Sequence, residues 1–306
     1  MDQGNSKLKM KNLKLKKLKN ILKKLKSVVI AYSGGVDSTF LVKMAIDTLG
    51  HTRVIAVTAR SETYPYSEYK DAKRLAKRMG AKHITIHTKE LRIKNFKSNP
   101  LNRCYYCKFE LFKKLIEIKR RASFAGVVDG TNYDDLKDIR YGRKAAEELG
   151  VRSPLLEAGI GKDLIRRHSK ELELDTWQKP SFACLASRLP FHTDITAEKL
   201  EKIDKAENYL RQLGFKQVRV RIHKEIARLE FYKEDFKKML SKEINNKVIK
   251  HLKVLGFKYI TMDLEGYRTG SMHETYNVIA RSPAAEGGGR RSNPKNEIAS
   301  ALRASQ

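Results

Sequence analysis

Short strand-like runs alternate with helical segments along the first part of this chain. Apolar and β-branched residues gather at 28–30, 53–59, 82–87 and 124–128, and helical patterns follow at 40–46, 66–79 and 109–121. A crossover helix returns the chain to the same edge of a sheet, so this alternation predicts an α/β fold with a parallel, doubly wound sheet. Ligands of such sheets bind beyond the carboxyl ends of the strands.

The pattern changes near Pro190. Helices are predicted at 195–213 and 246–255, and strands at 216–223, 226–232 and 259–267. Helices mixed with neighbouring antiparallel strands predict a smaller α+β domain. We therefore expect four parts: a basic helix at 1–26, the doubly wound domain at 27–190, the α+β domain at 191–281, and a disordered tail or expression remnant at 282–306.

The chain is strongly basic, because 64 Lys and Arg residues outnumber 35 Asp and Glu residues and give a formal net charge of +29. This balance predicts anionic partners. In the helix at 1–26, Leu15, Leu18, Leu22 and Leu25 recur at helical spacing, which indicates a docking helix, with a nucleic-acid arm as the alternative. No apolar run is long enough for a bilayer and no secretory signal is evident, so we expect a cytoplasmic protein without membrane contact.

A glycine turn follows the first strand in the stretch AYSGGVDST. Ser33, Gly34 and Gly35 leave backbone N–H groups open to a phosphate, and the helix N-terminus behind them adds a favourable dipole. Asp37, which we expect in an exposed loop, would repel a bare phosphate but can hold Mg²⁺. The stretch lacks the lysine of a Walker loop. It is therefore either an anion cradle or an ordinary glycine turn with a helix cap.

The motif S-G-G-x-D-S after a first strand resembles the PP-loop of ATP pyrophosphatases, which bind the pyrophosphate of ATP and attack its α-phosphate. A second loop of that superfamily matches DGTNYDD, from Asp129 to Asp135. The resemblance implies ATP and Mg²⁺. It assigns pyrophosphate and magnesium to Ser33, Gly34, Gly35, Asp37 and Ser38, the flanks of adenosine to Ala31, Thr58 and Arg60, and closure of the site to Asp129, Gly130 and Thr131.

The chain has three cysteines, Cys104 and Cys107 in NRCYYCK and Cys184 in FACLASR. Three thiols cannot complete a four-cysteine zinc site, although zinc with His192 or His83 is one alternative and three unrelated cysteines are another. Three thiolates can also hold a 4Fe–4S cluster with one iron left open to sulfide.

Six motifs are similar, in the same order, to the LarE family of sulfur transferases: SGGVDS, RCYYCK, DGTNYDD, GRKAAEELGVRSPL, WQKPSFACLASRLP and ITAEKL. That family converts pyridinium-3,5-biscarboxylic acid mononucleotide into its thiocarboxylate form for the nickel-pincer cofactor of lactate racemase. One branch sacrifices the sulfur of a cysteine in the Cys184 loop, and the other holds a rechargeable cluster on three cysteines. The three cysteines here favour a 4Fe–4S cluster on Cys104, Cys107 and Cys184.

The same resemblance implies further site residues. Arg219 and Arg221 lie two apart on a predicted strand and would bind the substrate phosphate, with a solvated basic face as the alternative. Ser187 and Arg188 match catalytic positions of the family. Glu207 also matches, although a glutamate on a helix is usually on the surface, and Lys108 could neutralise phosphate or cluster charge.

The sequence leaves other functions open. A cluster-dependent tRNA thiolase also combines three cysteines with adenylation and would suit the basic chain, whereas a ligase of the NAD or GMP synthetase type leaves the cysteines without a role. A non-catalytic nucleic-acid binder explains neither loop. The resemblance favours a small nucleotide substrate and a homo-oligomer, with nucleic acid not favoured, and the sulfide source is unknown.

Overall fold

The computed structural model describes residues 2–137, 141–180, 183–268 and 271. The described residues as far as Tyr267 form one compact unit. The proposed tail at 282–306 lies outside the described residues, and the boundary near residue 190 stays a prediction. Within the described part of the chain, no helix combines the length and the apolar character needed to cross a membrane.

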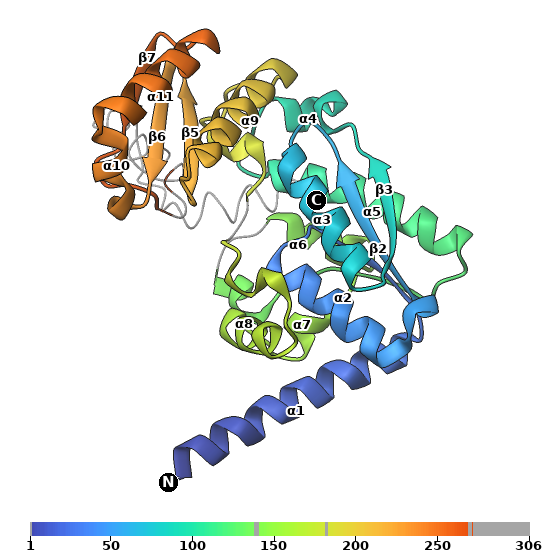
Figure 1. Ribbon diagram of the computed structural model, residues 1–306. Helices are drawn as coiled ribbons and strands as arrows, with labels where there is room; N and C mark the ends of the chain where they lie inside the picture. The colour runs from blue at the N-terminus through green and yellow to red at the C-terminus, as the bar shows by residue number, and fades with distance from the viewer. Residues whose placement is uncertain (1, 138–140, 181–182, 269–270, 272–306) are drawn as a thin grey trace, which may run out of the picture. The chain divides into compact units, whose positions relative to one another are not determined.

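Four parallel strands form the first sheet, in the order β3-β2-β1-β4 (Figure 1). The central strand β1 (Val28–Ala31) pairs with β2 (Val54–Arg60) on one side and with β4 (Gly126–Val128) on the other, and β3 (Lys82–His87) pairs with β2. Strand order reverses at β1, which confirms the predicted α/β sheet and puts the switch point beside the Ser33–Ser38 turn.

Helices cover both faces of this sheet. Alternate residues of β1 point to opposite faces, so they pack against different sets of helices. Val28 and Ile30 pack in one apolar cluster with helices α1, α2, α3 and α8, whereas Val29 and Ala31 pack in another with α5 and α6. The helices of this part are α1 (Asp2–Leu25), α2 (Val36–Leu49), α3 (Tyr66–Arg78), α4 (Lys94–Lys97), α5 (Arg103–Arg121), α6 (Tyr141–Glu148), α7 (Pro154–Glu157) and α8 (Lys162–Glu171).

The second sheet has the order β5-β6-β7 (Figure 1). β5 (Val218–His223) and β6 (Ile226–Phe231) are antiparallel, as predicted, but β7 (Tyr259–Met262) runs parallel to β6. The associated helices are α9 (Ala197–Gln212), α10 (Phe236–Leu240) and α11 (Lys242–Val254). One face of β5 and β6, carrying Val218, Val220 and Leu229, packs in an apolar core with α9 and α11.

The CYYC stretch lies outside the helix predicted at 109–121, but the structure has it in a helix, so that predicted helix is too short. Helix α5 begins at Arg103 rather than at residue 109. Tyr105 and Phe109 pack against the core of the first sheet and Tyr106 against that of the second, so buried aromatic residues extend the helix toward its N-terminus. Cys104 and Cys107 are three residues apart on α5 and therefore share one side of the helix.

Helix α1 docks through its leucines, as its spacing predicts. Leu18 and Leu22 are fully buried and Leu15 nearly so, all within the apolar cluster of the first sheet. Leu13, on the same helix, is 63% exposed. The part of the basic helix from Leu15 to Leu22 is therefore docked on the folded core.

Truncation of these two leucines tests the docking. We expect Leu18→Ala to lower the free energy of unfolding by about 2–5 kcal/mol, because it leaves a cavity in a packed core. Leu13→Ala should change it by less than about 0.5 kcal/mol. Urea unfolding followed by circular dichroism measures both, and equal losses in the two variants would contradict the docking.

Candidate active site

The turn after β1 depends on close packing of glycine. Gly34 has φ +63°, and a Cβ built there would lie 2.8 Å from the Cβ of Ala72 on α3. The Ser38 hydroxyl closes the turn, since it accepts from the Ser33 N–H at 3.2 Å and donates to the Gly35 carbonyl at 3.2 Å. A side chain at position 34 would both strain the backbone and collide with α3.

Two donors hold the carbonyl groups of this turn. The Tyr64 hydroxyl donates to the Ser33 carbonyl at 2.7 Å, and Lys179 Nζ donates to the Gly34 carbonyl at 3.4 Å. In a trans peptide the carbonyl and the following N–H point in opposite directions, so the amides of Gly34 and Gly35 face away from these donors. The turn therefore holds its N–H groups in fixed directions, and the Gly35 N–H donates to the Ser33 hydroxyl at 3.4 Å.

The second predicted loop lies against the first. Asp129 accepts hydrogen bonds from the Thr131 N–H at 3.1 Å, the Thr131 hydroxyl at 2.8 Å and the Ser153 hydroxyl at 2.7 Å. A Cβ on Gly130 would lie 3.1 Å from the backbone nitrogen of Ser38. Gly130 thus permits close contact between the two loops, while Asp129 shapes its own loop.

Asp37 lies in the first turn of α2 and is half-buried, so the expectation of an exposed loop is wrong. Its Oδ2 pairs with Lys162 Nζ at 2.5 Å, and its Oδ1 is buried without a hydrogen-bond partner in the described part of the chain. Lys162 is the first residue of α8, and its N–H donates to Asp134 at 2.7 Å. This lysine, 125 residues away from Asp37 in the sequence, was not predicted.

The residues expected to flank adenosine lie in different settings. Ala31 and Thr58 are buried, and the Thr58 hydroxyl donates to the Tyr32 carbonyl at 2.8 Å and contacts His83 Nε2 at 2.8 Å. Arg60 is exposed and lies over the rings of Tyr66 and Tyr69. Arg60, Tyr66 and Tyr69 line a hollow of about 290 Å³. Tyr64, Glu201 and Asp204 line the same hollow.

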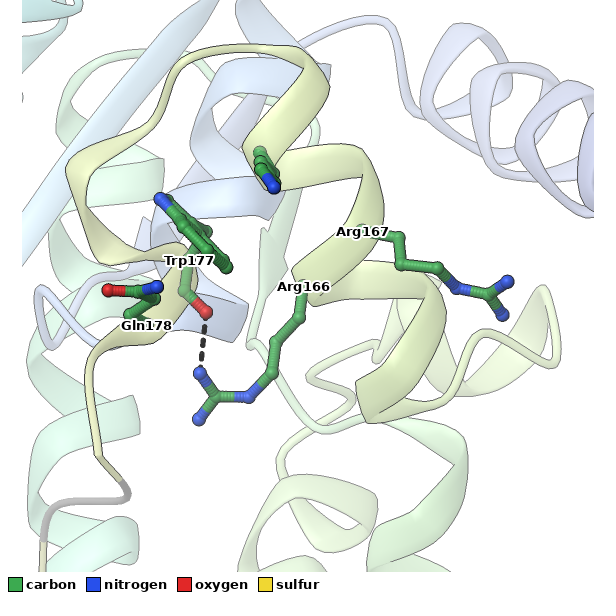
Figure 2. Close-up of a pocket in the computed structure, with 5 residues that line it drawn as sticks. Arg166, Arg167, Trp177 and Gln178 are labelled. Atoms are coloured by element: carbon green, nitrogen blue, oxygen red, sulfur yellow. Dashed lines mark hydrogen bonds between the residues drawn. The ribbon is translucent and has the colours of Figure 1, made fainter.

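A larger hollow, of about 470 Å³, contains none of the predicted site residues. It is lined by Arg166, Arg167, Lys170, Trp177 and Gln178 (Figure 2). Arg166 donates to the carbonyls of Trp177 and Lys179, at 2.5 and 2.8 Å. Arg166 thereby connects α8 to Lys179, the residue that donates to the Gly34 carbonyl.

Cys107 lies within electrostatic range of both Cys104 and Cys184. Burial raises the pKa of the Cys107 thiol well above its usual value, and Glu90, Cys184 and Cys104 raise it further. Cys107 and Cys184 also pack against the same apolar core. Within the described ranges, no group of three His, Cys, Asp or Glu side chains is arranged to hold a single metal ion.

Lys108 lies beside these thiols. Its charge lowers the pKa of Cys107, although the other influences outweigh it. Its ammonium group lies 5.1 Å from the centre of the Phe112 ring. Its role in neutralising phosphate or cluster charge stays a prediction.

The segment that carries Cys184 is attached to the nucleotide side of the sheet. Lys179 reaches the Gly34 carbonyl, and the Leu185 N–H donates to the Thr63 carbonyl at 2.9 Å. Thr63 follows β2, whose carboxyl end belongs to the same edge as the Ser33–Ser38 turn. A cysteine far along the sequence is therefore held near the predicted ATP loop.

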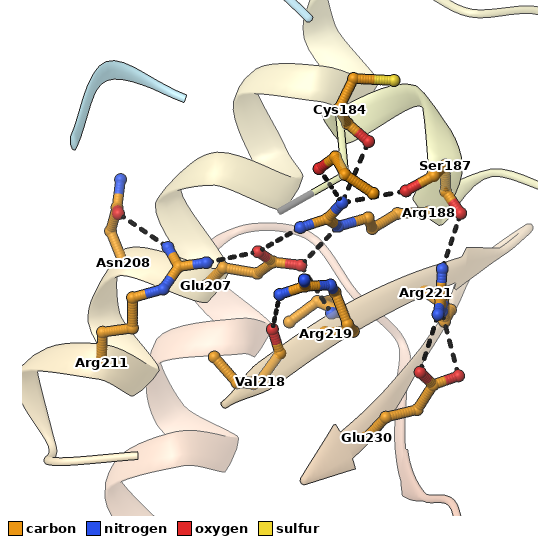
Figure 3. Close-up of polar contacts among 12 residues, drawn as sticks. Cys184, Ser187, Arg188, Glu207, Asn208, Arg211, Val218, Arg219, Arg221 and Glu230 are labelled. Carbon is orange, nitrogen blue, oxygen red and sulfur yellow. Dashed lines mark hydrogen bonds and ion pairs between the residues drawn. The ribbon is translucent and has the colours of Figure 1, made fainter. Parts of the chain in front are cut away.

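Arg188 and Glu207 form a fully buried ion pair (Figure 3). Arg188 Nε and Nη2 donate to the two Glu207 oxygens at 2.8 and 3.0 Å, and Nη1 donates to the carbonyl of Cys184 at 3.0 Å. Burial alone would raise the pKa of Glu207, but Arg188 lowers it to about 2. Glu207 is thus not a surface residue, and Arg188 positions the Cys184 segment.

Arg219 and Arg221 are each about 5% exposed, so the alternative of a solvated basic face is wrong. Arg221 makes a two-pronged pair with Glu230 at 3.0 and 2.9 Å and donates to the Ser187 carbonyl at 2.7 Å (Figure 3). Burial lowers the pKa of Arg219 to about 10, and the charge of Arg188 lowers it too. The two arginines adjoin the Cys184 segment from β5.

Comparison with known proteins gives matches over nearly the whole chain. A pyridinium-3,5-bisthiocarboxylic acid mononucleotide synthase of Lactiplantibacillus plantarum is 39% identical over 83% of this chain and 91% of its own. Uncharacterized proteins of Synechocystis and Methanocaldococcus jannaschii are 42% and 36% identical, over 85% and 86% of this chain and 97% of each of theirs. The family model of NAD synthase matches residues 11–107.

Replacement of the buried arginine tests its structural role. We expect Arg188→Met to lower the free energy of unfolding by about 3–5 kcal/mol, because it leaves the Glu207 carboxylate buried without its main partner. Arg211→Met removes a more exposed partner of the same carboxylate and should cost about 1 kcal/mol or less. Urea unfolding compares them, and a cost for Arg211→Met as large as that for Arg188→Met would contradict this ranking.

Proposed function

The chain belongs to the LarE family of PP-loop proteins, and we propose that it is an ATP-dependent sulfurtransferase that makes a thiocarboxylate from pyridinium-3,5-biscarboxylic acid mononucleotide. One observation carries the proposal: the segment that bears Cys184 is hydrogen-bonded through Lys179 to the carbonyl of Gly34 in the ATP loop. This contact supports a site in which the sulfur donor lies near the bound ATP.

Activation of the substrate explains why the site needs ATP. A carboxylate is a poor electrophile because it is already anionic, so it attacks the α-phosphorus, releases pyrophosphate and becomes an acyl-adenylate. Sulfide then attacks the acyl carbon, and AMP leaves with the oxygen that the carboxylate contributed. The amides of Gly34 and Gly35 stabilise the negative charge on the phosphates.

Asp37 and Lys162 have complementary parts in this step. The buried Oδ1 of Asp37 has no partner in the described residues, which suits a cation, and Mg²⁺ bound there supplies charge against the phosphates. With Mg²⁺ held by Asp37, the Lys162 ammonium beside it would bind the pyrophosphate oxygens. It takes the role that the lysine of a Walker loop has in other nucleotide sites.

The buried arginines near β5 suit the phosphate of the substrate. Among the described residues, the charge network joins Arg188, Arg211, Arg219, Arg221 and Arg228 to Glu207, Glu230 and Asp263. Burial lowers the pKa of Arg219, and the positive charge of Arg188 lowers it further. An anion bound at Arg219 would stabilise its charge.

The three cysteines suit a 4Fe–4S cluster as the carrier of sulfur. Thiolates of such a cluster bind different irons, so they stand farther apart than the ligands of one ion. A Cys107 thiol within electrostatic range of the other two, with the cation of Lys108 beside it, fits this donor set. The cluster, when bound, supplies an iron that has no protein thiolate and can hold sulfide.

Pyrophosphate release tests the ATP half of the proposal. We expect Asp37→Asn and Lys162→Met to slow substrate-dependent release of pyrophosphate and AMP by at least about 100-fold, because each removes a charge that stabilises the reacting phosphates. The exposed pair Lys43–Asp47 on the same helix α2 provides matched controls, Asp47→Asn and Lys43→Met, which should act like the parent. Formation of ADP and phosphate instead would overturn the assignment.

A second experiment distinguishes the two sources of sulfur. With a cluster, alanine at any one of Cys104, Cys107 and Cys184 should abolish iron binding and sulfur transfer, while pyrophosphate release continues. With a sacrificial cysteine, only Cys184→Ala should be inactive, and the spent protein should lose the mass of H₂S. Iron analysis and mass spectrometry after one turnover decide between them.

A further inference from the structure

Glu90 is a buried carboxylate beside one of the three thiols. It begins the short helix Glu90–Arg92, which follows the carboxyl end of β3, and it is only 3% exposed. Its Oε1 accepts a hydrogen bond from the Thr88 hydroxyl at 2.9 Å and lies 3.7 Å from Cys107 Sγ. Its Oε2 is buried and has no hydrogen-bond partner among the residues that the structure describes.

A buried carboxylate oxygen without a partner is costly, because it has lost its water and gained nothing in return. The surroundings add to the cost, since Cys104, Cys107 and Cys184 also become anionic when they bind a metal. Lys108 is one cation near these groups. A cluster held partly by Cys107 would bring iron close to the Glu90 carboxylate, because Oε1 lies 3.7 Å from Cys107 Sγ, and the iron without a thiolate would be open to the free Oε2.

We propose that Glu90 is an oxygen ligand of the iron that the three cysteines leave without a thiolate. The inference rests on the cluster of the proposed function and adds a residue to it. Carboxylate is a harder ligand than thiolate and suits iron less well in a sulfur-rich cluster. It can therefore retain the fourth iron when sulfide is absent without blocking the position permanently.

Retention of the fourth iron is the property to measure. The full chain is reconstituted anaerobically with ferrous iron and sulfide, then treated with a mild oxidant and a chelator. Loss of the fourth iron leaves a three-iron cluster, and the growth of its EPR signal gives the rate of that loss. We expect Glu90→Gln, which keeps the size of the side chain, to lose its fourth iron at least ten-fold faster than the parent, and Glu90→Asp to lie between them.

Two variants serve as controls. Glu117→Gln changes an exposed carboxylate on α5, the helix that carries Cys104 and Cys107, and should lose iron at the parental rate. Thr88→Val removes the hydrogen bond to Oε1 but leaves the carboxylate, so its rate should stay within about two-fold of the parent.

The outcomes separate this inference from the function on which it rests. Equal rates of iron loss in Glu90→Gln and the parent overturn the role of Glu90 while the cluster stands. A parent chain that binds no iron overturns both the cluster and the role of Glu90. Pyrophosphate release, measured in the same samples, then shows whether the ATP half of the function survives.

Discussion

The buried pair of Arg188 and Glu207 is the interaction on which the candidate site depends. It joins α9 to the segment that carries Cys184, because the same guanidinium binds the Glu207 carboxylate and the Cys184 carbonyl. Burial of two charges is favourable only when their hydrogen bonds are nearly all made. The cost of breaking this pair therefore keeps the Cys184 carbonyl and Arg188 attached to α9.

That segment is in contact with several different parts of the chain. Lys179 contacts the ATP loop, Leu185 contacts the residue Thr63 after β2, and Arg188 contacts α9. Arg221 adds a contact to Ser187 from β5. Sulfur transfer to an activated acyl group needs a fixed distance between donor and acceptor, and this arrangement supplies rigidity at that point.

Much of the fold follows from the sequence, whereas much of the site does not. Strand–helix alternation predicted the parallel sheet, and the glycine pair predicted the turn that joins β1 to α2. The charged residues were harder to place. Glu207 and Arg211 are four residues apart, which is the spacing of a surface ion pair on a helix. Arg188, the buried partner of Glu207, approaches it only in the folded chain. Lys162 contacts Asp37 and Glu90 contacts Cys107, and both partners are distant in the sequence. No local sequence pattern therefore predicts these contacts. The hydrophobic pattern predicted α5 only from residue 109. It missed the first turns of the helix, which carry Cys104 and Cys107.

The central claim is that one site activates a carboxylate with ATP and then replaces its oxygen by sulfur. Substrate labelled with ¹⁸O in its carboxylates tests this most directly, with mass spectrometry of the nucleotide product. The account predicts that AMP gains one ¹⁸O atom for each thiocarboxylate formed, because the carboxylate oxygen that attacked the α-phosphorus leaves with it. Unlabelled AMP, or label found in pyrophosphate or phosphate, would contradict it.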